Sequence, residues 1–175
     1  MRFAGRAWRA HDPKWSFSPL AGAGAAQTGG RFNRKGQAAL YLALDLATAV
    51  AEAAQGFGQR IPPLTLCEYD VDCEEIAGLS DEATRAPLGV TAGDIACAWL
   101  TFQLAGKRAP SQLVAQRLKA EGYAGLLAPS FAPGASGTNL VLWAWGPAAP
   151  HKVEVYDPDG RLPRDRRSWT AEGAS

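Results

Sequence analysis

Three side chains that could act together on a charged substrate lie near one another in the first third of the chain, at Arg31, Tyr41 and Glu52. Arg31 directly follows two glycines, whose backbone freedom lets a ligand approach closely, so its guanidinium could bind a phosphate or a carboxylate. Tyr41 lies in a short apolar run, and Glu52 lies in the alanine-rich stretch that follows. Each residue also has an ordinary interpretation, as a turn arginine, a core tyrosine and a solvated glutamate, and taken singly none identifies a site.

The local pattern predicts a strand, a tight turn and then a helix around these residues. Residues 38–43 form an apolar run of strand length that contains Tyr41. Asp45 is a suitable N-cap and Gly56 a suitable residue to end the helix, so Glu52 is expected about two turns into it. This arrangement would bring Tyr41 and Glu52 to one end of a sheet.

Strands outnumber helices in the rest of the chain. Further strands are expected at residues 3–9, 64–71, 123–128, 139–145 and 152–156. Thr91 has the spacing of a capping box that opens one long helix to about Ala105, and Ser111 is the expected N-cap of another helix. Residues 11–30 are expected to form an extended loop and residues 72–89 a surface excursion. Because strands and helices do not alternate regularly, the pattern predicts a single α+β domain with a mixed, largely antiparallel sheet.

The composition indicates one globular domain of ordinary size. The chain has 175 residues, of which 47% are hydrophobic and 20% are charged. The net charge of +1 gives no long-range field that favours nucleic acid, and no apolar run approaches the roughly 20 residues of a membrane span. We therefore expect a cytoplasmic protein that contacts neither nucleic acid nor membrane directly. The three cysteines form no C-x-x-C pair and the two histidines are far apart, so no metal site is indicated.

The order of several motifs resembles that of the RES domain family, the toxin half of RES–Xre toxin–antitoxin pairs. The motifs are Trp8-Arg9, residues 22–25 (GAGA), 29–33 (GGRFN) and 41–43 (YLA), Ala49-x-x-Glu52, Pro129-Ser130, and residues 137–140 (GTNL). The family takes its name from an arginine, a glutamate and a serine, for which this chain offers Arg31, Glu52 and Ser130. The resemblance makes residues 1–160 the RES domain and leaves residues 161–175 as a basic, mobile C-terminal tail.

RES domains resemble the ADP-ribosyltransferases, which consume NAD+, both in fold and in site. The resemblance therefore implies an ADP-ribosyltransferase-like fold with NAD+ as co-substrate and no metal. It implies catalytic roles for Glu52, Tyr41 and Arg31, and contacts with NAD+ for Arg9, Arg31, Tyr41, Ser130 and Asn139. Glu52 would stabilise the positive charge that develops on the ribose, and Arg31 would hold the pyrophosphate. The pocket is expected where the elements that carry Arg31, Tyr41, Glu52 and Ser130 converge.

The serine is the position at which the chain departs from the family pattern. A small residue and then often an arginine are expected after Pro129-Ser130, but this chain has Phe131 and Ala132. Ser136, in the same loop, is the alternative family serine.

The resemblance implies a toxin that cleaves the nicotinamide–ribose bond of NAD+ and transfers ADP-ribose to a protein target. Water or phosphate could instead accept the ADP-ribose, which would make the protein an NAD+ glycohydrolase or phosphorylase. A non-enzymatic interaction protein, which docks through its basic tail and tryptophans, is the third interpretation. The implied partner is a cognate antitoxin with a Xre-like helix-turn-helix domain that covers the pocket, so that contact with DNA belongs to the antitoxin.

Overall fold

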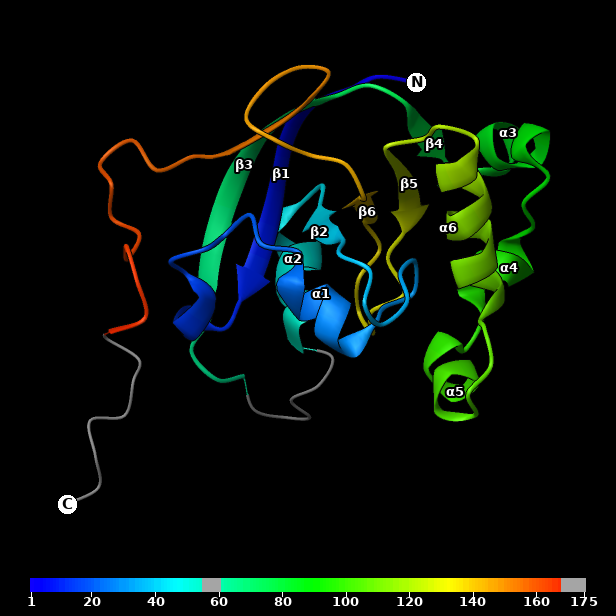
Figure 1. Cartoon of the computed structure of the whole chain (residues 1–175), viewed down its shortest axis with the longest axis horizontal. Helices are drawn as coiled ribbons and strands as arrows, with labels where there is room; N and C mark the ends of the chain where they lie inside the picture. Colours follow the sequence, from blue (N-terminus) through cyan, green and yellow to red (C-terminus); the bar gives the residue numbers. More distant parts are fainter. Residues whose placement is uncertain (55–60, 168–175) are drawn as a thin grey trace.

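The computed structural model describes residues 1–54 and 61–167, and within them seven strands form one sheet (Figure 1). The strands are β1 (Phe3–His11), β2 (Leu40–Ala43), β3 (Thr65–Cys73), β4 (Ile76–Gly78), β5 (Gly125–Pro129), β6 (Thr138–Leu142) and β7 (His151–Val155). Their spatial order is β4-β5-β6-β2-β1-β3-β7, and the neighbouring pairs are antiparallel except β4 with β5. The predicted α+β class with a mixed, largely antiparallel sheet is confirmed.

The helices are short, and several begin at a side-chain cap. They are α1 (Ala23–Thr28), α2 (Leu46–Ala54), α3 (Glu82–Arg85), α4 (Ala92–Ala96), α5 (Trp99–Leu104) and α6 (Pro110–Ala120), with 3-10 turns η1 (Pro13–Trp15) and η2 (Ala86–Leu88). Asp45, Asp81 and Thr91 accept hydrogen bonds from first-turn amides of α2, α3 and α4, respectively. Gly56, predicted to end α2, lies outside the described residues. Within residues 1–54 and 61–167, no helix is long and apolar enough to cross a membrane.

Two stretches that were expected to be irregular contain regular structure. The predicted loop at residues 11–30 holds η1 and α1, and the predicted surface excursion at residues 72–89 holds β4, α3 and η2. The first prediction was wrong because α1 has no buried residue and therefore no apolar period to detect. The second was wrong because Ile76 and Leu79 are fully buried where β4 pairs in parallel with β5. This pairing, rather than the local sequence, determines the strand.

Two predictions about the helices between residues 91 and 120 were also wrong. The helix predicted to run from Thr91 is broken at Cys97, whose ψ of 153° is that of an extended residue. The N-cap of α6 is Ala109, and a proline occupies the first turn, where a missing amide hydrogen is tolerated. Ser111 lies inside the helix, and its hydroxyl donates to the carbonyl of Arg31 instead of capping α6.

Two clusters of buried side chains cover the two faces of the sheet. Val141 of β6 belongs to one cluster and Leu140 to the other, because successive side chains of a strand point to opposite faces. On the Val141 face, α6 contributes Leu118, and α1 and α4 also pack there. In Figure 1, α3, α4 and α6 lie beside β4 and β5, and α5 lies below α4 and α6. On the Leu140 face, residues of connecting segments such as Leu20 and Leu162 cover the sheet.

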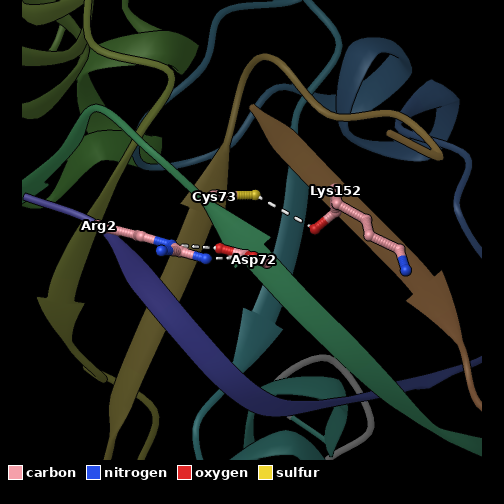
Figure 2. A network of polar contacts seen from close by, with 4 residues as sticks. All are labelled: Arg2, Asp72, Cys73 and Lys152. Carbon is pink, nitrogen blue, oxygen red and sulfur yellow. Dashed lines mark hydrogen bonds and ion pairs between the residues drawn. The ribbon is translucent and has the colours of Figure 1, made fainter. Parts of the chain in front are cut away.

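Polar contacts join β1, β3 and β7, which lie at the edge of the sheet away from β4 (Figure 2). The guanidinium of Arg2 donates two hydrogen bonds of 2.6 Å to the carboxylate of Asp72, which connects the start of β1 to the end of β3. The thiol of Cys73 donates to the carbonyl of Lys152 in β7 at 3.5 Å. Because the Arg2–Asp72 pair is exposed to solvent, the register of these strands depends mainly on buried side chains such as Tyr69.

Part of the predicted C-terminal tail packs on the domain. Leu162 packs against the Leu140-face cluster, and the guanidinium of Arg166 lies over the ring of Trp15, 4.4 Å from its centroid. These contacts hold the segment up to residue 167 against η1 and the sheet. Residues 168–175, the rest of the tail, lie outside the described part of the chain.

Candidate active site

A cavity of about 310 Å³ lies on the Val141 face of the sheet, where β1 and β2 meet. The two strands are paired through Trp8 and Ala43, and residues of both form part of the cavity wall. The turn after α1, helices α2 and α5, the segment after β5 and strand β6 complete it, through Gly30, Arg31, Glu52, Trp99, Phe131 and Asn139. The volume is at the lower end of the range of about 300–1,000 Å³ that is usual for small-molecule sites.

Within the part of the chain that the structure describes, a serine and an asparagine from other elements donate to the carboxylate of Glu52. Its Oε1 atom accepts a hydrogen bond from Ser130 Oγ at 2.6 Å and a second one from Asn139 Nδ2. Ser130 directly follows β5 and Asn139 lies near the start of β6. Both donors therefore come from the loop end of the β5–β6 hairpin, which meets helix α2 at Glu52. Because hydrogen bonds to an ionised carboxylate are charge-assisted, the two donors fix the position of the Glu52 side chain at the cavity wall.

A close contact with the start of α2 brings the Ser130 segment to Glu52. A side-chain carbon at Gly137 would overlap with the carboxylate of Asp45 and with the hydroxyl of Thr48, so only glycine fits. Thr48 is buried, and its hydroxyl donates to Asp45 Oδ2 at 2.7 Å. The carbonyl of Gly137 in turn accepts from the amide of Ser130 at 2.8 Å. The N-cap of α2 and the Ser130 segment are therefore packed as one unit, with Glu52 two turns further along the helix.

Three contacts hold the guanidinium of Arg31 at the cavity wall. Its Nη1 atom donates to the carbonyls of Ile95 at 2.8 Å and Cys97 at 2.7 Å, in the break between α4 and α5. The ring of Phe131 stacks on it, with 4.2 Å between Arg31 Cζ and the ring centroid. Burial lowers the pKa of Arg31, and interactions with Cys97 and Glu52 oppose this shift, so the group stays charged at neutral pH. A fixed cation therefore lies near the Glu52 carboxylate.

Tyr41 lines the cavity, but its hydroxyl is used by the turn that carries Arg31. The hydroxyl donates to Asn33 Oδ1 at 2.8 Å and accepts from the amide of Phe32 at 3.0 Å. Burial raises the pKa of Tyr41, so the phenol is protonated at neutral pH. Tyr41 therefore connects β2 to the Arg31 turn, and its ring, rather than its hydroxyl, is the part available to a ligand.

Comparison with known proteins identifies the family. The family model described as the RES domain matches residues 6–165. The chain belongs to the RES domain family. This family is associated with NAD-related toxins of toxin–antitoxin pairs and is usually linked to NAD-acting enzymes. A search of curated proteins finds no match to this RES domain.

Of the three residues predicted to be the arginine, glutamate and serine that name the RES domain, Arg31 and Glu52 line this cavity, and Ser130 donates a hydrogen bond to Glu52. Ser130 bonds directly to Glu52, whereas Ser136 is exposed. The geometry thus favours Ser130 over Ser136 as the family serine. Phe131 is the position at which the sequence departs from the family pattern. Its ring stacks on the guanidinium of Arg31 and helps to hold it at the cavity wall.

Arg9 contributes to the cavity wall of the RES domain, but its guanidinium is bound elsewhere. Its Nη1 atom donates to the carbonyls of Pro19 and Ala21, each at 3.1 Å. Burial lowers the pKa of Arg9, and interaction with Tyr69, a core residue of the Leu140 face, opposes this shift. The contact of Arg9 with NAD+ therefore stays a prediction, and the structure gives this side chain a role in fixing the segment before α1.

Two further residues of the RES domain site have only weak signals in the sequence. Trp99 lines the cavity from α5, but its spacing suits an ordinary apolar helix face equally well. Asn33 lies two residues after Arg31 in the GGRFN motif, which is the signal that could have singled it out. Among the residues that the structure describes, no group of three or more His, Cys, Asp or Glu side chains could hold a metal ion.

Proposed function

We propose that this RES domain cleaves the bond between nicotinamide and ribose in NAD+. The observation that best supports this function is the Glu52 carboxylate, which two hydrogen bonds fix at the wall of a cavity shared with Arg31. An anion that is oriented before the reaction stabilises a developing positive charge without further reorganisation. The site therefore combines an anion for the developing charge on the ribose with a cation for the pyrophosphate.

The chemistry of the bond explains the role of the carboxylate. When the bond between the nicotinamide nitrogen and the ribose carbon breaks, nicotinamide leaves with both bonding electrons, and the ribose acquires oxocarbenium character. Glu52 stabilises this charge, which is larger in the transition state than in the bound substrate. An acceptor oxygen or nitrogen then bonds to the ribose carbon and loses a proton. Among the described residues that line the cavity, Glu52 is the only carboxylate and is therefore the candidate base.

The other residues of the cavity would bind and orient NAD+. Within the described residues, the guanidinium of Arg31 donates only through Nη1, so Nε and Nη2 are available to the pyrophosphate oxygens. The rings of Tyr41 and Trp99 offer apolar surfaces to the nicotinamide and the adjoining ribose. Ser130 and Asn139 act through Glu52, because both donate to its Oε1 atom.

A protein side chain is the proposed acceptor of ADP-ribose. Two elements that line the cavity also expose large apolar residues. Leu100 and Leu104 of α5, the helix whose Trp99 lines the cavity, are 50% and 81% accessible, and the lining residue Phe131 is 36% accessible. Exposed apolar residues that adjoin a site are typical of surfaces that dock proteins. Water or phosphate is the alternative acceptor and requires no docking surface; the protein would then be an NAD+ glycohydrolase or phosphorylase.

A cognate antitoxin with a Xre-like helix-turn-helix domain is the proposed partner. Family membership supports this partner, and the near-neutral charge of the chain agrees with leaving DNA contact to the antitoxin. A part of the antitoxin that covers the cavity would keep NAD+ away from Glu52.

Brief induced expression of the wild type and of Glu52→Gln tests the proposed function in cells. Glutamine retains an Oε1 acceptor for Ser130 and Asn139, so the variant should keep the fold while losing the negative charge. We expect the wild type to stop growth in a Glu52-dependent way, with cellular NAD+ and ADP-ribosylated proteins measured in parallel. Loss of NAD+ without protein modification would favour water or phosphate as the acceptor.

The same experiment discriminates the non-enzymatic interpretation. A protein that acts only by docking would stop growth equally well with glutamine at position 52. Equal growth arrest by two equally folded proteins would therefore contradict an enzymatic role for Glu52 and favour an interaction protein.

A further inference from the structure

The turn that carries Arg31 is a narrow loop closed by its own backbone. Gly30 and Asn33 exchange two hydrogen bonds, from the amide of Gly30 at 2.9 Å and from the amide of Asn33 at 3.4 Å. Arg31 and Phe32 therefore occupy the two corner positions. A four-residue turn with one weak closing bond can open, so the direction of the Arg31 side chain depends on what holds the turn from outside.

Side chains from helix α6 bond to the carbonyls of this turn. The amide nitrogen of Gln112 donates to the carbonyl of Gly30 at 3.0 Å and to that of Asn33 at 3.3 Å. The hydroxyl of Ser111 donates to the carbonyl of Arg31 at 2.7 Å. Both side chains are buried, with 5% of Gln112 and none of Ser111 accessible to solvent. About 80 residues of sequence separate the turn from the helix that holds it.

We infer that Gln112 is a positioning residue that fixes the Arg31 turn and thereby sets the guanidinium for the phosphates of the substrate. The inference rests on the proposed function for the identity of that substrate. One amide group reaches both ends of the turn, so it fixes the distance between them. The guanidinium is held separately, at the break between α4 and α5, so both the backbone and the tip of the Arg31 side chain are attached where this residue lines the cavity.

The chain offers a matched pair of glutamines for the test. Gln112→Met keeps an unbranched side chain of similar length but removes the amide, which leaves the carbonyls of Gly30 and Asn33 without this donor. Gln116 lies one turn later on α6 and is exposed, so Gln116→Met makes the same chemical change on the same helix away from the turn. Thermal unfolding of both variants identifies any general loss of structure.

Steady-state cleavage of NAD+ gives the first measurement. We expect Gln112→Met to raise KM for NAD+ by about tenfold, which corresponds to about 1.4 kcal/mol and is of the size of one hydrogen bond. The change in kcat should be smaller, because Glu52 is held by other elements, and Gln116→Met should behave like the wild type. In an Arg31→Ala background, Gln112→Met should raise KM no further. An equal additional increase in that background would overturn the inference.

Hydrogen exchange of the peptide that contains residues 30–33 gives the second measurement and requires no activity. We expect faster exchange in Gln112→Met than in Gln116→Met, and equal exchange would overturn the inference. A wild-type protein that does not cleave NAD+ would refute the proposed function alone, because the exchange comparison still decides whether Gln112 holds the turn.

Discussion

Replacing Ser130 with alanine tests whether the hydrogen bonds to Glu52 matter for the chemistry. The substitution removes the hydrogen bond of 2.6 Å from Ser130 Oγ to Glu52 Oε1 and leaves the hydrogen bond from Asn139. A hydrogen bond to a charged group contributes about 1.5–3 kcal/mol. Since about 1.4 kcal/mol in the barrier is tenfold in rate, kcat should fall by about tenfold to about 100-fold if the full contribution is lost in the transition state.

Release of nicotinamide from NAD+ at saturating substrate is the assay, and Ser136→Ala is the control. Ser136 lies in the same segment and is exposed, so its loss should leave kcat unchanged. Ser130 Oγ also accepts from the amide of Ala132 at 3.2 Å, and Ser130→Ala should therefore lower the free energy of unfolding by about 1 kcal/mol. Equal kcat values for the two serine variants, both folded, would refute the role given to the Ser130–Glu52 bond.

Three further substitutions examine the arginine, the packing and the pH dependence. Phe131→Leu removes a stacking contact worth about 0.5–2 kcal/mol, so KM for NAD+ should rise by about twofold to about 30-fold, and an unchanged KM in steady-state kinetics would contradict the contact. Gly137→Ala should lower the free energy of unfolding by about 1–3 kcal/mol in denaturant titrations, whereas Gly24→Ala, with nothing within 4 Å, should not. Burial, and secondarily the charge of Arg9, lowers the pKa of His11 from 6.5 to about 4. As the pH drops, His11 is therefore protonated in the unfolded chain before it is protonated in the folded one. The free energy of unfolding consequently falls between about pH 6.5 and about pH 4. His11→Gln should show a smaller decrease in Tm over that pH interval, and an identical decrease would exclude His11 as its source.

The strand and helix that carry Tyr41 and Glu52 could be predicted because their signals are local. An apolar run of strand length gives β2, and a carboxylate at Asp45 caps the first turn of α2. Family resemblance then singled out Ser130, which the structure places on Glu52. Local periodicity could not give that contact, because it forms between residues 78 positions apart.

The parts that could not be predicted depend on contacts between distant segments. Ser111 has the composition of an N-cap, but the carbonyl of Arg31 is its acceptor in the folded chain. The helix expected after Thr91 is interrupted at Cys97, where carbonyls of the break bond to the Arg31 guanidinium. Likewise, Ile76 becomes a core residue only because β4 pairs with β5. In each case the partner lies too far along the chain for a local pattern to show it.

Glu52 has a matched control elsewhere on the surface. Glu74 is exposed in the connection between β3 and β4 and does not line the cavity, so Glu74→Gln makes the same change in charge away from the site. Any effect of the change in net charge, or of protein purification and storage, should be the same in Glu52→Gln and Glu74→Gln.

Nicotinamide release from NAD+ by purified wild type, Glu52→Gln and Glu74→Gln is the most direct measurement of the central claim. The wild type and Glu74→Gln should release nicotinamide at the same rate, and Glu52→Gln should be slower by at least about 100-fold, the usual size of a lost acid–base or charge-stabilising group. All three proteins should have similar Tm values. Equal rates for the wild type and Glu52→Gln would contradict the assignment of Glu52 as the residue that stabilises the transition state.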